Sequence, residues 1–260
     1  MGTLDGRVAI ITGAGRGLGR EHALLFASQG AKVVVNDLGG ANDGSGSDMT
    51  PAQQTVADIK AMGGEAIVNG DNVADWAGAK RMVDSAIETF GDLDILVNNA
   101  GINPAPTTVS DMSIEYWRKM FNVNLEGPLR MAQQVAPFMR DNGGGSIVNI
   151  VTMAAYSGGS NVCAYGSSKA GLINLTKSMA QEWAPWNIRV NALCPGPFMT
   201  EMVAGAERVR EGFIDMIANG TLMKRVADAD EIVGPVLYLA SDASSYVTGD
   251  EISVSGGMQK

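Results

Sequence analysis

The chain has 260 residues and carries 28 aspartates and glutamates against 19 lysines and arginines, a formal net charge of −9 at pH 7. This length suits one large α/β domain, and the acidic balance argues against nucleic acid or an anionic membrane as a partner. No apolar run reaches the roughly 18 residues that span a bilayer, and no signal segment is recognisable at the N-terminus, so we expect a cytoplasmic protein.

The residue types that bind metals or form disulfides are scarce. Cys163 and Cys194 are the two cysteines and lack C-x-x-C spacing, and His22 is the single histidine. We therefore predict no disulfide framework, no metal site and no Ser-His-Asp catalytic set. His22 falls on the first predicted helix, where we expect a packing or surface residue.

The first predicted element is a buried parallel strand over residues 8–12, a short apolar run rich in β-branched side chains. A glycine-rich turn over residues 13–19 follows, and a helical pattern begins at Leu18. Free backbone N–H groups and the helix dipole at such a turn bind a pyrophosphate. The glycines are spaced G-x-x-x-G-x-G rather than G-x-G-x-x-G, and a plain strand-to-helix turn is the alternative interpretation.

The second predicted strand, residues 32–36, ends at Asp37. A carboxylate at this position accepts the ribose hydroxyls of an adenosine and repels a 2′-phosphate. No arginine or lysine lies between Asp37 and Lys60 to offset that repulsion, so the sequence favours NAD over NADP. The alternative is that Asp37 merely opens a polar loop. Residues 39–48 are poor in apolar side chains and are expected to form a solvated loop near the adenosine, with a partner-binding role as the alternative.

Strand and helix patterns alternate along the rest of the chain, which predicts a parallel sheet covered by helices on both faces. We expect a single-domain, Rossmann-like doubly wound sheet of about seven strands over residues 1–260, with the ligand at the carboxyl ends of the strands. The further predicted strands are residues 65–69, 94–97, 146–151, 188–194 and 251–254, and the predicted helices are residues 50–62, 74–90, 113–140, 163–183, 201–219 and 228–240.

Tyr165 and Lys169 lie four residues apart at the start of a predicted helix and so share one face of it. Thr152 lies thirteen residues before Tyr165, at the end of a strand. An ammonium near a phenol lowers the phenol's pKa, and this pair would supply a proton donor and acceptor near neutral pH. A solvated helix face is the alternative for this spacing alone.

Together these features resemble the classical short-chain dehydrogenases/reductases over essentially the whole chain. The first hundred residues are most similar to the hydroxyacyl-CoA dehydrogenase part of multifunctional β-oxidation enzymes, and residues 34–40 with the glycine-rich insert after them carry that likeness. The rest is more similar to acyl-carrier-protein ketoreductases and to sugar or steroid dehydrogenases, so the substrate stays open. The matching motifs are TGAGRGLG (12–19), DNV (71–73), NNAG (98–101), NVNL (122–125), Thr152, YGSSK (165–169) and PGPFMT (195–200).

The resemblance implies a nicotinamide coenzyme held along the strand ends. Asp71 is expected to accept from the adenine amino group, the Phe198 backbone to meet the nicotinamide amide, and Thr200 to reach that amide or the pyrophosphate. Asn98 could equally join neighbouring strands. The full expected coenzyme-binding set is Gly13, Arg16, Gly17, Leu18, Gly19, Asp37, Leu38, Asp71, Asn72, Val73, Asn98, Ala100, Gly101, Tyr165, Lys169, Pro195, Gly196, Phe198 and Thr200.

The resemblance also implies the catalytic roles. Tyr165 is the acid/base, Lys169 lowers its pKa and binds the nicotinamide ribose, Thr152 hydrogen-bonds the substrate oxygen, and Asn124 holds a water that links Lys169 to solvent. The family usually has serine where this chain has Thr152, and the extra methyl group narrows the pocket. The expected reaction transfers a hydride between NAD(H) and a secondary alcohol or ketone. The alternatives are an NADP-linked 3-oxoacyl ketoreductase acting on acyl-carrier-protein or CoA esters, and a non-catalytic nucleotide-binding sensor, against which the intact catalytic residues argue.

The substrate pocket and the assembly are less determined. Residues 201–222 are expected to form a lid over the substrate, with an ordinary surface helix pair as the alternative. The long predicted helices at residues 113–140 and 161–183 imply, by resemblance, a homotetramer. The candidate pocket residues are Met153, Cys163, Met199, Met202, Phe213 and Met223. The alternative is that the methionines fill the core.

Overall fold

The computed structural model describes residues 2–40, 45–103 and 106–258, and its centre is a seven-stranded sheet in the order β3-β2-β1-β4-β5-β6-β7. Every pair of neighbouring strands is parallel, as the alternation of patterns predicts. The strand order reverses at β1, which pairs with β2 on one side and with β4 on the other. β3 lies beyond β2, and β5, β6 and β7 lie beyond β4. The strands are β1 (Val8–Thr12), β2 (Lys32–Asn36), β3 (Glu65–Asn69), β4 (Ile95–Asn98), β5 (Gly145–Ile150), β6 (Ile188–Pro195) and β7 (Glu251–Val254).

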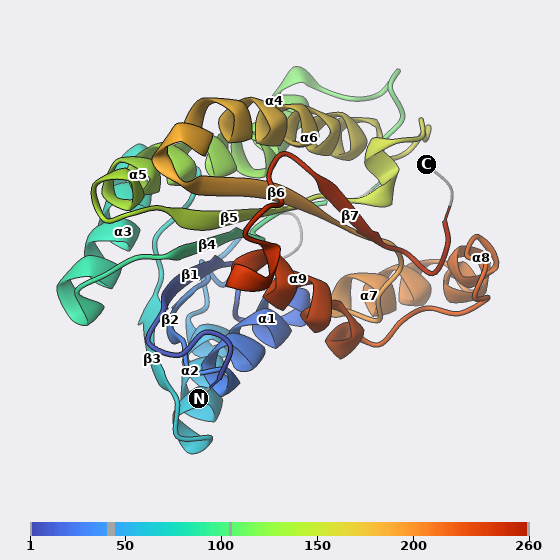
Figure 1. The fold of residues 1–260 in the computed structure, drawn as a ribbon. Coiled ribbons are helices and arrows are strands. Elements are labelled where there is room, and N and C mark those ends of the chain that lie inside the picture. The colour runs from blue at the N-terminus through green and yellow to red at the C-terminus, as the bar shows by residue number, and fades with distance from the viewer. Residues whose placement is uncertain (1, 41–44, 104–105, 259–260) are drawn as a thin grey trace.

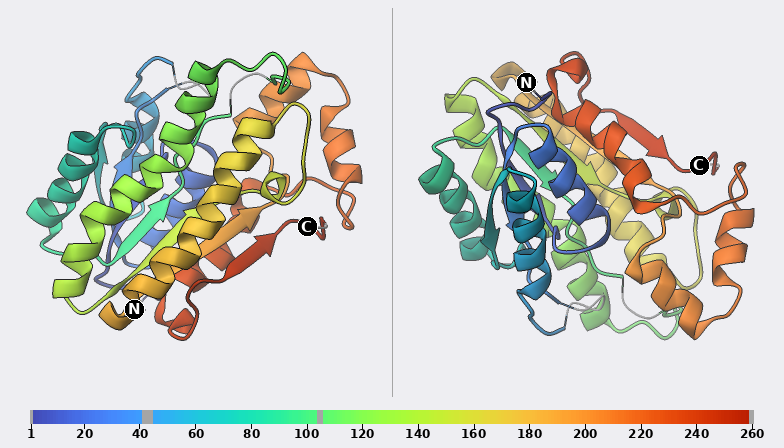
Figure 2. Two further views of the ribbon diagram at one scale, coloured as in Figure 1. Left: turned by 90° about the horizontal axis from the view of Figure 1, so that it is seen from above. Right: turned by 90° about the horizontal axis from the view of Figure 1, so that it is seen from below.

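Helices cover both faces of the sheet (Figure 1). One face carries α1 (Gly17–Ser28), α2 (Thr50–Ala61) and α9 (Val233–Ala240), and the other carries α3 (Trp76–Phe90), α4 (Ile114–Asn124), α5 (Glu126–Asp141) and α6 (Cys163–Trp183); Figure 2 shows each layer in turn. Two short helices, α7 (Glu201–Val209) and α8 (Phe213–Asn219), extend beyond the strand ends and bury none of their residues. The 3₁₀ turns are η1 (Met153–Ala155), η2 (Ala184–Trp186), η3 (Ala229–Ile232) and η4 (Asp242–Ser244).

The central strands read as continuous apolar runs because both of their faces are buried. Ile11 and Val35 pack into the core beneath α1 and α2, whereas Ile10 and Val34 pack into the core beneath α3 and α5. Successive side chains of a strand point to opposite faces, so each central strand serves both cores. Residues 41–44 of the glycine-rich loop predicted near the adenosine lie outside the described residues.

The prediction of one helix over residues 113–140 is wrong, because the chain forms α4 and α5 with Leu125 between them at φ −119° and ψ −54°. Pro128 explains the break. A proline has no N–H to donate to the carbonyl four residues earlier, here that of Asn124, and its ring clashes with that carbonyl. The break leaves Asn124 at the end of α4, where its side chain turns into the interior.

Two other predicted helices are also divided. Residues 201–219 form α7 and α8, separated by a turn at Gly212, which has φ +79°. Residues 228–240 begin as the 3₁₀ turn η3 before continuing as α9. Gly212 adopts a left-handed conformation that costs most other residues free energy, so glycine there allows the turn.

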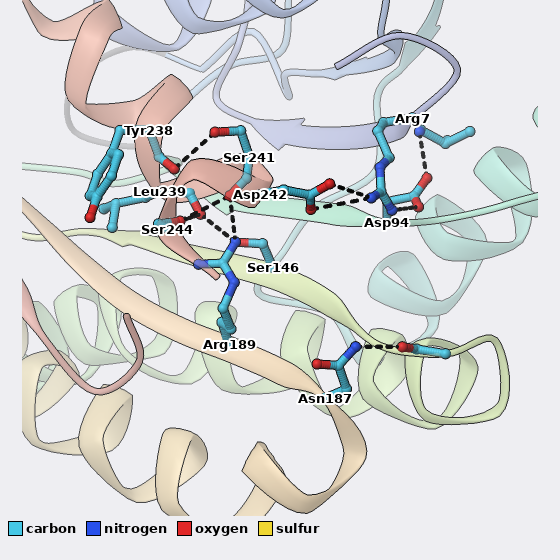
Figure 3. A network of polar contacts seen from close by, with 12 residues as sticks. Arg7, Asp94, Ser146, Asn187, Arg189, Tyr238, Leu239, Ser241, Asp242 and Ser244 are labelled. Atoms are coloured by element: carbon cyan, nitrogen blue, oxygen red, sulfur yellow. Dashed lines mark hydrogen bonds and ion pairs between the residues drawn. The ribbon is translucent and has the colours of Figure 1, made fainter. Parts of the chain in front are cut away.

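A polar network lies at the amino end of the sheet, opposite the expected coenzyme edge (Figure 3). Arg7 Nη1 lies 2.7 Å from Asp94 Oδ1, and the other oxygen of Asp94 accepts from the Val8 amide at 2.8 Å. Arg7 also reaches Asp242, which follows α9, at 3.4 Å. Arg189 Nη2 donates to the carbonyl oxygens of Leu239 and Ser241 at 2.9 and 3.1 Å. The network therefore joins β1, β4 and β6 to the end of α9.

Candidate active site

The glycine-rich turn after β1 is packed so closely that only glycine fits. Gly13 and Gly17 have φ of +64° and +53°. A Cβ at Gly13 would lie 2.9 Å from the Ala100 Cα, and a Cβ at Gly19 would lie 2.2 Å from the Gly13 carbonyl oxygen. At the start of α1, Arg16 makes no side-chain hydrogen bond to the first-turn N–H groups. The turn thus offers backbone donors at a helix N-terminus, which fits a pyrophosphate.

Asn99 ties this turn to the end of β4. Its Nδ2 donates to the carbonyl oxygens of Thr12 and Gly13, both at 3.0 Å. The Thr12 hydroxyl in turn accepts from the amides of Asn99 and Ala100 at 3.1 and 3.0 Å. Asn99 was absent from the predicted site, although it lies in the matching NNAG motif. It holds the two turns together at the point where the strand order reverses.

Asp37 faces the glycine-rich turn from the end of β2. Its Oδ2 accepts from the Gly15 amide at 2.8 Å and its Oδ1 from the Gly39 amide at 2.7 Å. Both oxygens keep lone pairs for further donors such as ribose hydroxyls. Arg16, in the glycine-rich turn, lies 4.0 Å from Asp48 and 3.9 Å from Glu201. Leu38, the next residue, is partly buried.

The predicted adenine-binding residues form a bonded turn after β3. Asp71 accepts from Arg81 Nη2 at 2.6 Å and from Asn69 Nδ2 at 3.0 Å. Asn72 Oδ1 accepts from the Ala74 amide at 2.9 Å, which leads the chain into α3. Val73 is buried and packs against Gly127. Any adenine contact of Asp71 therefore shares a carboxylate with Arg81.

The structure supports the strand-joining role of Asn98. Its side chain is buried and donates to Asn149 Oδ1 on β5 at 2.9 Å. Asn149 in turn donates to the Thr176 hydroxyl on α6 at 2.9 Å. This chain of bonds fixes α6, and with it Tyr165 and Lys169, relative to the end of β4.

Lys169, Asn124 and Gly101 meet near the carboxyl ends of β4 and β5. Lys169 is 3% exposed, and its Nζ donates to the Ile150 carbonyl oxygen at 2.7 Å. A Cβ at Gly101 would lie 3.3 Å from Asn124 Oδ1 and 3.6 Å from Lys169 Nζ. Asn124 exchanges hydrogen bonds of 2.8 and 2.9 Å with the Ile102 backbone, so its orientation is fixed. Burial lowers the pKa of Lys169 to about 8.

Tyr165 lies next to Thr152, as the sequence predicts. Burial raises the pKa of Tyr165, and a hydrogen bond with Thr152 opposes that rise. The predicted lowering of the Tyr165 pKa is wrong for this structure, because desolvation of the phenol has the largest effect.

A fixed turn follows β6 at the same edge of the sheet. The Gly196 amide donates to the Val254 carbonyl oxygen at 2.8 Å, and a Cβ at Gly196 would lie 2.6 Å from the Ser255 Cα. Phe198 is buried and pairs with Ala227 in an isolated parallel bridge. Pro195, at the end of β6, leads into this turn.

Thr200 caps the first turn of α7, where its hydroxyl accepts from the Val203 amide at 3.4 Å. A Cβ at Gly17 would lie 3.7 Å from the Thr200 Cγ2. The beginning of α7 therefore lies across the glycine-rich turn.

The candidate pocket residues lie in three different places. Met153 belongs to the core, with its Sδ 3.5 Å from Cys194 Sγ. Met199 and Met223 are exposed around α7 and α8. Cys163 lines a cavity of about 420 Å³ between the loop after β5 and α6, whose lining includes neither Thr152 nor Tyr165.

Within the described residues, no three His, Cys, Asp or Glu side chains gather as a possible metal site. No helix in the same part of the chain has both the length and the apolar character to cross a bilayer.

A glycine cradle at the switch in strand order, beside a buried lysine and a tyrosine, defines a Rossmann-type oxidoreductase site. Comparisons with known proteins agree with this class. The profile of the family described as Enoyl-(Acyl carrier protein) reductase matches residues 13–259. The chain is 38% identical over 256 residues to a 3-oxoacyl-(acyl-carrier-protein) reductase of Thermotoga maritima, covering 98% of each chain.

Solved structures agree too. A 7α-hydroxysteroid dehydrogenase with NADH and 7-oxo glycochenodeoxycholic acid is 36% identical, with a TM-score of 0.89 over 99% of this chain and 96% of that one. A gluconate 5-dehydrogenase of Burkholderia cenocepacia with NADP and tartrate is 33% identical, with a TM-score of 0.89 over 98% and 96%. The chain belongs to the short-chain dehydrogenase/reductase family, and it is an oxidoreductase acting on CH–OH groups.

Proposed function

We propose that this protein interconverts a secondary alcohol and a ketone with NAD(H). The observation that carries the proposal is the placement of Tyr165, bonded to Thr152, and of Lys169, buried beside Gly101, at the strand ends that also carry the glycine-rich turn. A bound nicotinamide coenzyme supplies hydride transfer, and the protein supplies position and proton transfer.

Each catalytic residue has a role that its contacts support. Tyr165 gives a proton to, or takes one from, the substrate oxygen, and Thr152 donates a hydrogen bond to that oxygen. Lys169 would hold the nicotinamide ribose, since its ammonium lies beside Gly101 in the crevice wall. Asn124, fixed by Ile102, would hold a water on the path from Lys169 to solvent.

The coenzyme set divides into three parts of the crevice. Asp37 and Leu38, followed by the turn with Asp71, Asn72 and Val73, would hold the adenosine. The glycine-rich turn would hold the pyrophosphate. The nicotinamide would lie against Ala100, Gly101, Tyr165, Lys169, Pro195, Gly196, Phe198 and Thr200. Asn98, which bonds to Asn149, would support this part of the site from behind.

NAD is proposed as the preferred coenzyme because the carboxylate of Asp37 ends β2 and Arg16 is engaged by Asp48 and Glu201. Dissociation constants for NADH and NADPH test this preference, and Asp37→Ala should bring the two closer together. Tighter binding of NADPH by the wild type would instead favour an NADP-linked 3-oxoacyl ketoreductase. The Thermotoga maritima reductase, 38% identical, is the observation that keeps this second candidate.

The proposed assembly is a homotetramer, supported by family membership and by the exposed lengths of α4, α5 and α6 along one face. Both cysteines are free thiols, which supports a reducing compartment such as the cytoplasm. Sedimentation of the purified protein would test the tetramer.

The deciding experiment is the variant Tyr165→Phe, assayed with a panel of secondary alcohols and ketones. Turnover should fall by about 100-fold or more because the proton donor and acceptor is lost, while the NADH dissociation constant should stay nearly unchanged. Retained turnover would refute the role of Tyr165. A wild-type protein that binds NADH but turns over no alcohol or ketone in the panel would favour the non-catalytic sensor.

A further inference from the structure

A second tyrosine, Tyr156, connects the loop after β5 to two other elements. Its hydroxyl donates to Glu251 Oε2 at the start of β7. The other oxygen of Glu251 lies 2.7 Å from Lys177 Nζ on α6. The side chain of Glu251 is only 14% exposed, so this carboxylate depends on its partners for compensation of its charge.

Tyr156 is joined to Thr152 by a short rigid turn. The Ala155 amide donates to the Thr152 carbonyl oxygen, and the Tyr156 amide donates to the Met153 carbonyl oxygen, both at 3.1 Å. These bonds form the 3₁₀ turn η1, which Thr152 begins and Tyr156 ends. A displacement of Tyr156 would therefore reach Thr152 through a stiff unit rather than through flexible chain.

The turn is packed on its inner side and open on its outer side. Met153, Ala155 and Tyr156 belong to one apolar cluster with Leu172 and Ile173 of α6. Ala154, Ala155 and Tyr156 also line a cavity of about 420 Å³, and the residues that follow, 157–161, are exposed. Because a void supplies no contacts, the bonds that anchor the turn contribute to its position on this side, and Tyr156–Glu251 is one of these.

Tyr156 is suited to anchoring and unsuited to proton transfer. Burial and the hydrogen bond to the Glu251 carboxylate both raise the pKa of its hydroxyl. The hydroxyl consequently remains a donor throughout the neutral range. Its function differs from that of Tyr165, although both tyrosines flank the same turn.

We propose that Tyr156, Glu251 and Lys177 form a positioning network that sets the Thr152 hydroxyl against Tyr165. This proposal rests on the proposed function, because Thr152 is taken to orient the substrate oxygen. Tyr156 is a positioning residue in this proposal, since it acts on Thr152 through η1.

The primary test is Tyr156→Phe, which removes only the anchoring hydroxyl. We expect kcat to fall about tenfold, since small misplacements of a reacting group are costly in rate, with the NADH dissociation constant unchanged. Tyr246→Phe makes the same chemical change at a fully exposed tyrosine and should leave kcat as in the wild type. A kcat for Tyr156→Phe within twofold of the wild type would overturn the network.

A double-mutant cycle separates positioning from general stability. In a Thr152→Ala background, Tyr156→Phe should cause no further loss of kcat, because the group that it positions is gone. An equal tenfold loss in both backgrounds would show that Tyr156 acts elsewhere and would overturn the proposal. If Tyr156→Phe does not fold, Glu251→Met, which removes the acceptor of the Tyr156 hydroxyl, serves in its place, with the same expected kcat loss and the same cycle.

The cycle also distinguishes this proposal from the proposed function. If Thr152→Ala keeps wild-type turnover while Tyr165→Phe has none, the protein is still the proposed dehydrogenase, but the positioning network is refuted. If Tyr165→Phe keeps its turnover, the proposed function itself fails.

Discussion

The amino ends of the strands (the amino edge of the sheet) and their carboxyl ends (the carboxyl edge) use polar residues in opposite ways. At the amino edge, the cations of Arg7 and Arg189 are bonded to carboxylates or to carbonyl groups of the chain (Figure 3). At the carboxyl edge, the buried ammonium of Lys169 donates to the Ile150 carbonyl oxygen, and glycines allow the turn after β1 to pack closely against the end of β4. The first edge stabilises the fold, whereas the second keeps hydrogen-bonding capacity for chemistry.

The difference teaches where stability and activity should separate under mutation. A residue of the amino edge should change the free energy of unfolding and leave turnover alone. A residue of the carboxyl edge should change turnover without loss of stability, because its charge is buried at a cost that the fold alone does not offset.

The largest expected effect is that of Lys169→Met. Turnover should fall by about 100-fold or more, while stability at pH 7 should not decrease. Burial lowers the pKa of Lys169 from 10.5 to about 8. Between these values the unfolded chain holds the proton more tightly, so wild-type stability rises with pH across that window, by up to about 1.4 kcal/mol per pH unit.

Urea denaturation at pH 7 and pH 10, together with steady-state turnover, checks the Lys169 prediction. The variant should lack the rise in stability that the wild type shows. Lys80→Met, at an exposed position on α3, is the control and should retain both turnover and the pH response. A variant that loses turnover and stability together would contradict the separation.

The next effect is that of Arg189→Met at the amino edge. Loss of the guanidinium leaves the carbonyls of Leu239 and Ser241 without this donor, and we expect a loss of about 2 kcal/mol in unfolding free energy. Turnover per folded molecule should remain unchanged. Arg140→Met removes a surface cation bonded to Asp141 and should leave stability as in the wild type. Reduced turnover in a stably folded Arg189→Met would argue against the division between the edges.

The smallest effect concerns His22, which belongs to neither edge. It is fully buried in α1, and neither ring nitrogen has a hydrogen-bond partner among the described residues. Replacing it by leucine should add about 1–2 kcal/mol to stability near pH 7.5, because an unpaired polar group is removed from the interior.

His22→Leu should also weaken the acid sensitivity of the fold. Burial lowers the pKa of His22 to about 3, so its folded pKa lies below its unfolded value of 6.5. Wild-type stability from this group is complete above pH 6.5 and is lost as pH falls towards 3. Urea titrations at pH 7.5 and pH 5 should show a smaller difference for the leucine variant, and an equal difference would disprove the assignment. His22→Ala, which leaves a cavity, should not stabilise.

The sheet and most of its helices could be predicted from the sequence because periodicity is local. The strands, the glycine-rich turn, and the Tyr165–Thr152 neighbourhood follow from runs of fewer than twenty residues. The break at Leu125 was also local, but it required attention to the missing N–H of Pro128 rather than to the apolar pattern.

The features that were missed depend on distant partners. Tyr156 and Glu251 are 95 positions apart, and no spacing rule links them. The raised pKa of Tyr165 reflects its burial in the finished fold. Asn99 was in a matching motif, but its two carbonyl partners across the strand switch become visible only in three dimensions.

Pro128 influences the candidate site because it has no backbone N–H. It lies one helical turn beyond Asn124, where the helix is interrupted. The side-chain amide of Asn124 hydrogen-bonds to the Ile102 backbone at this point. Every other amino acid would restore a backbone donor at this point and invite the two helices to fuse. The constraint at this position is therefore on the backbone N–H and not on the side chain. A substitution of Pro128 would alter the candidate site by changing the position of Asn124.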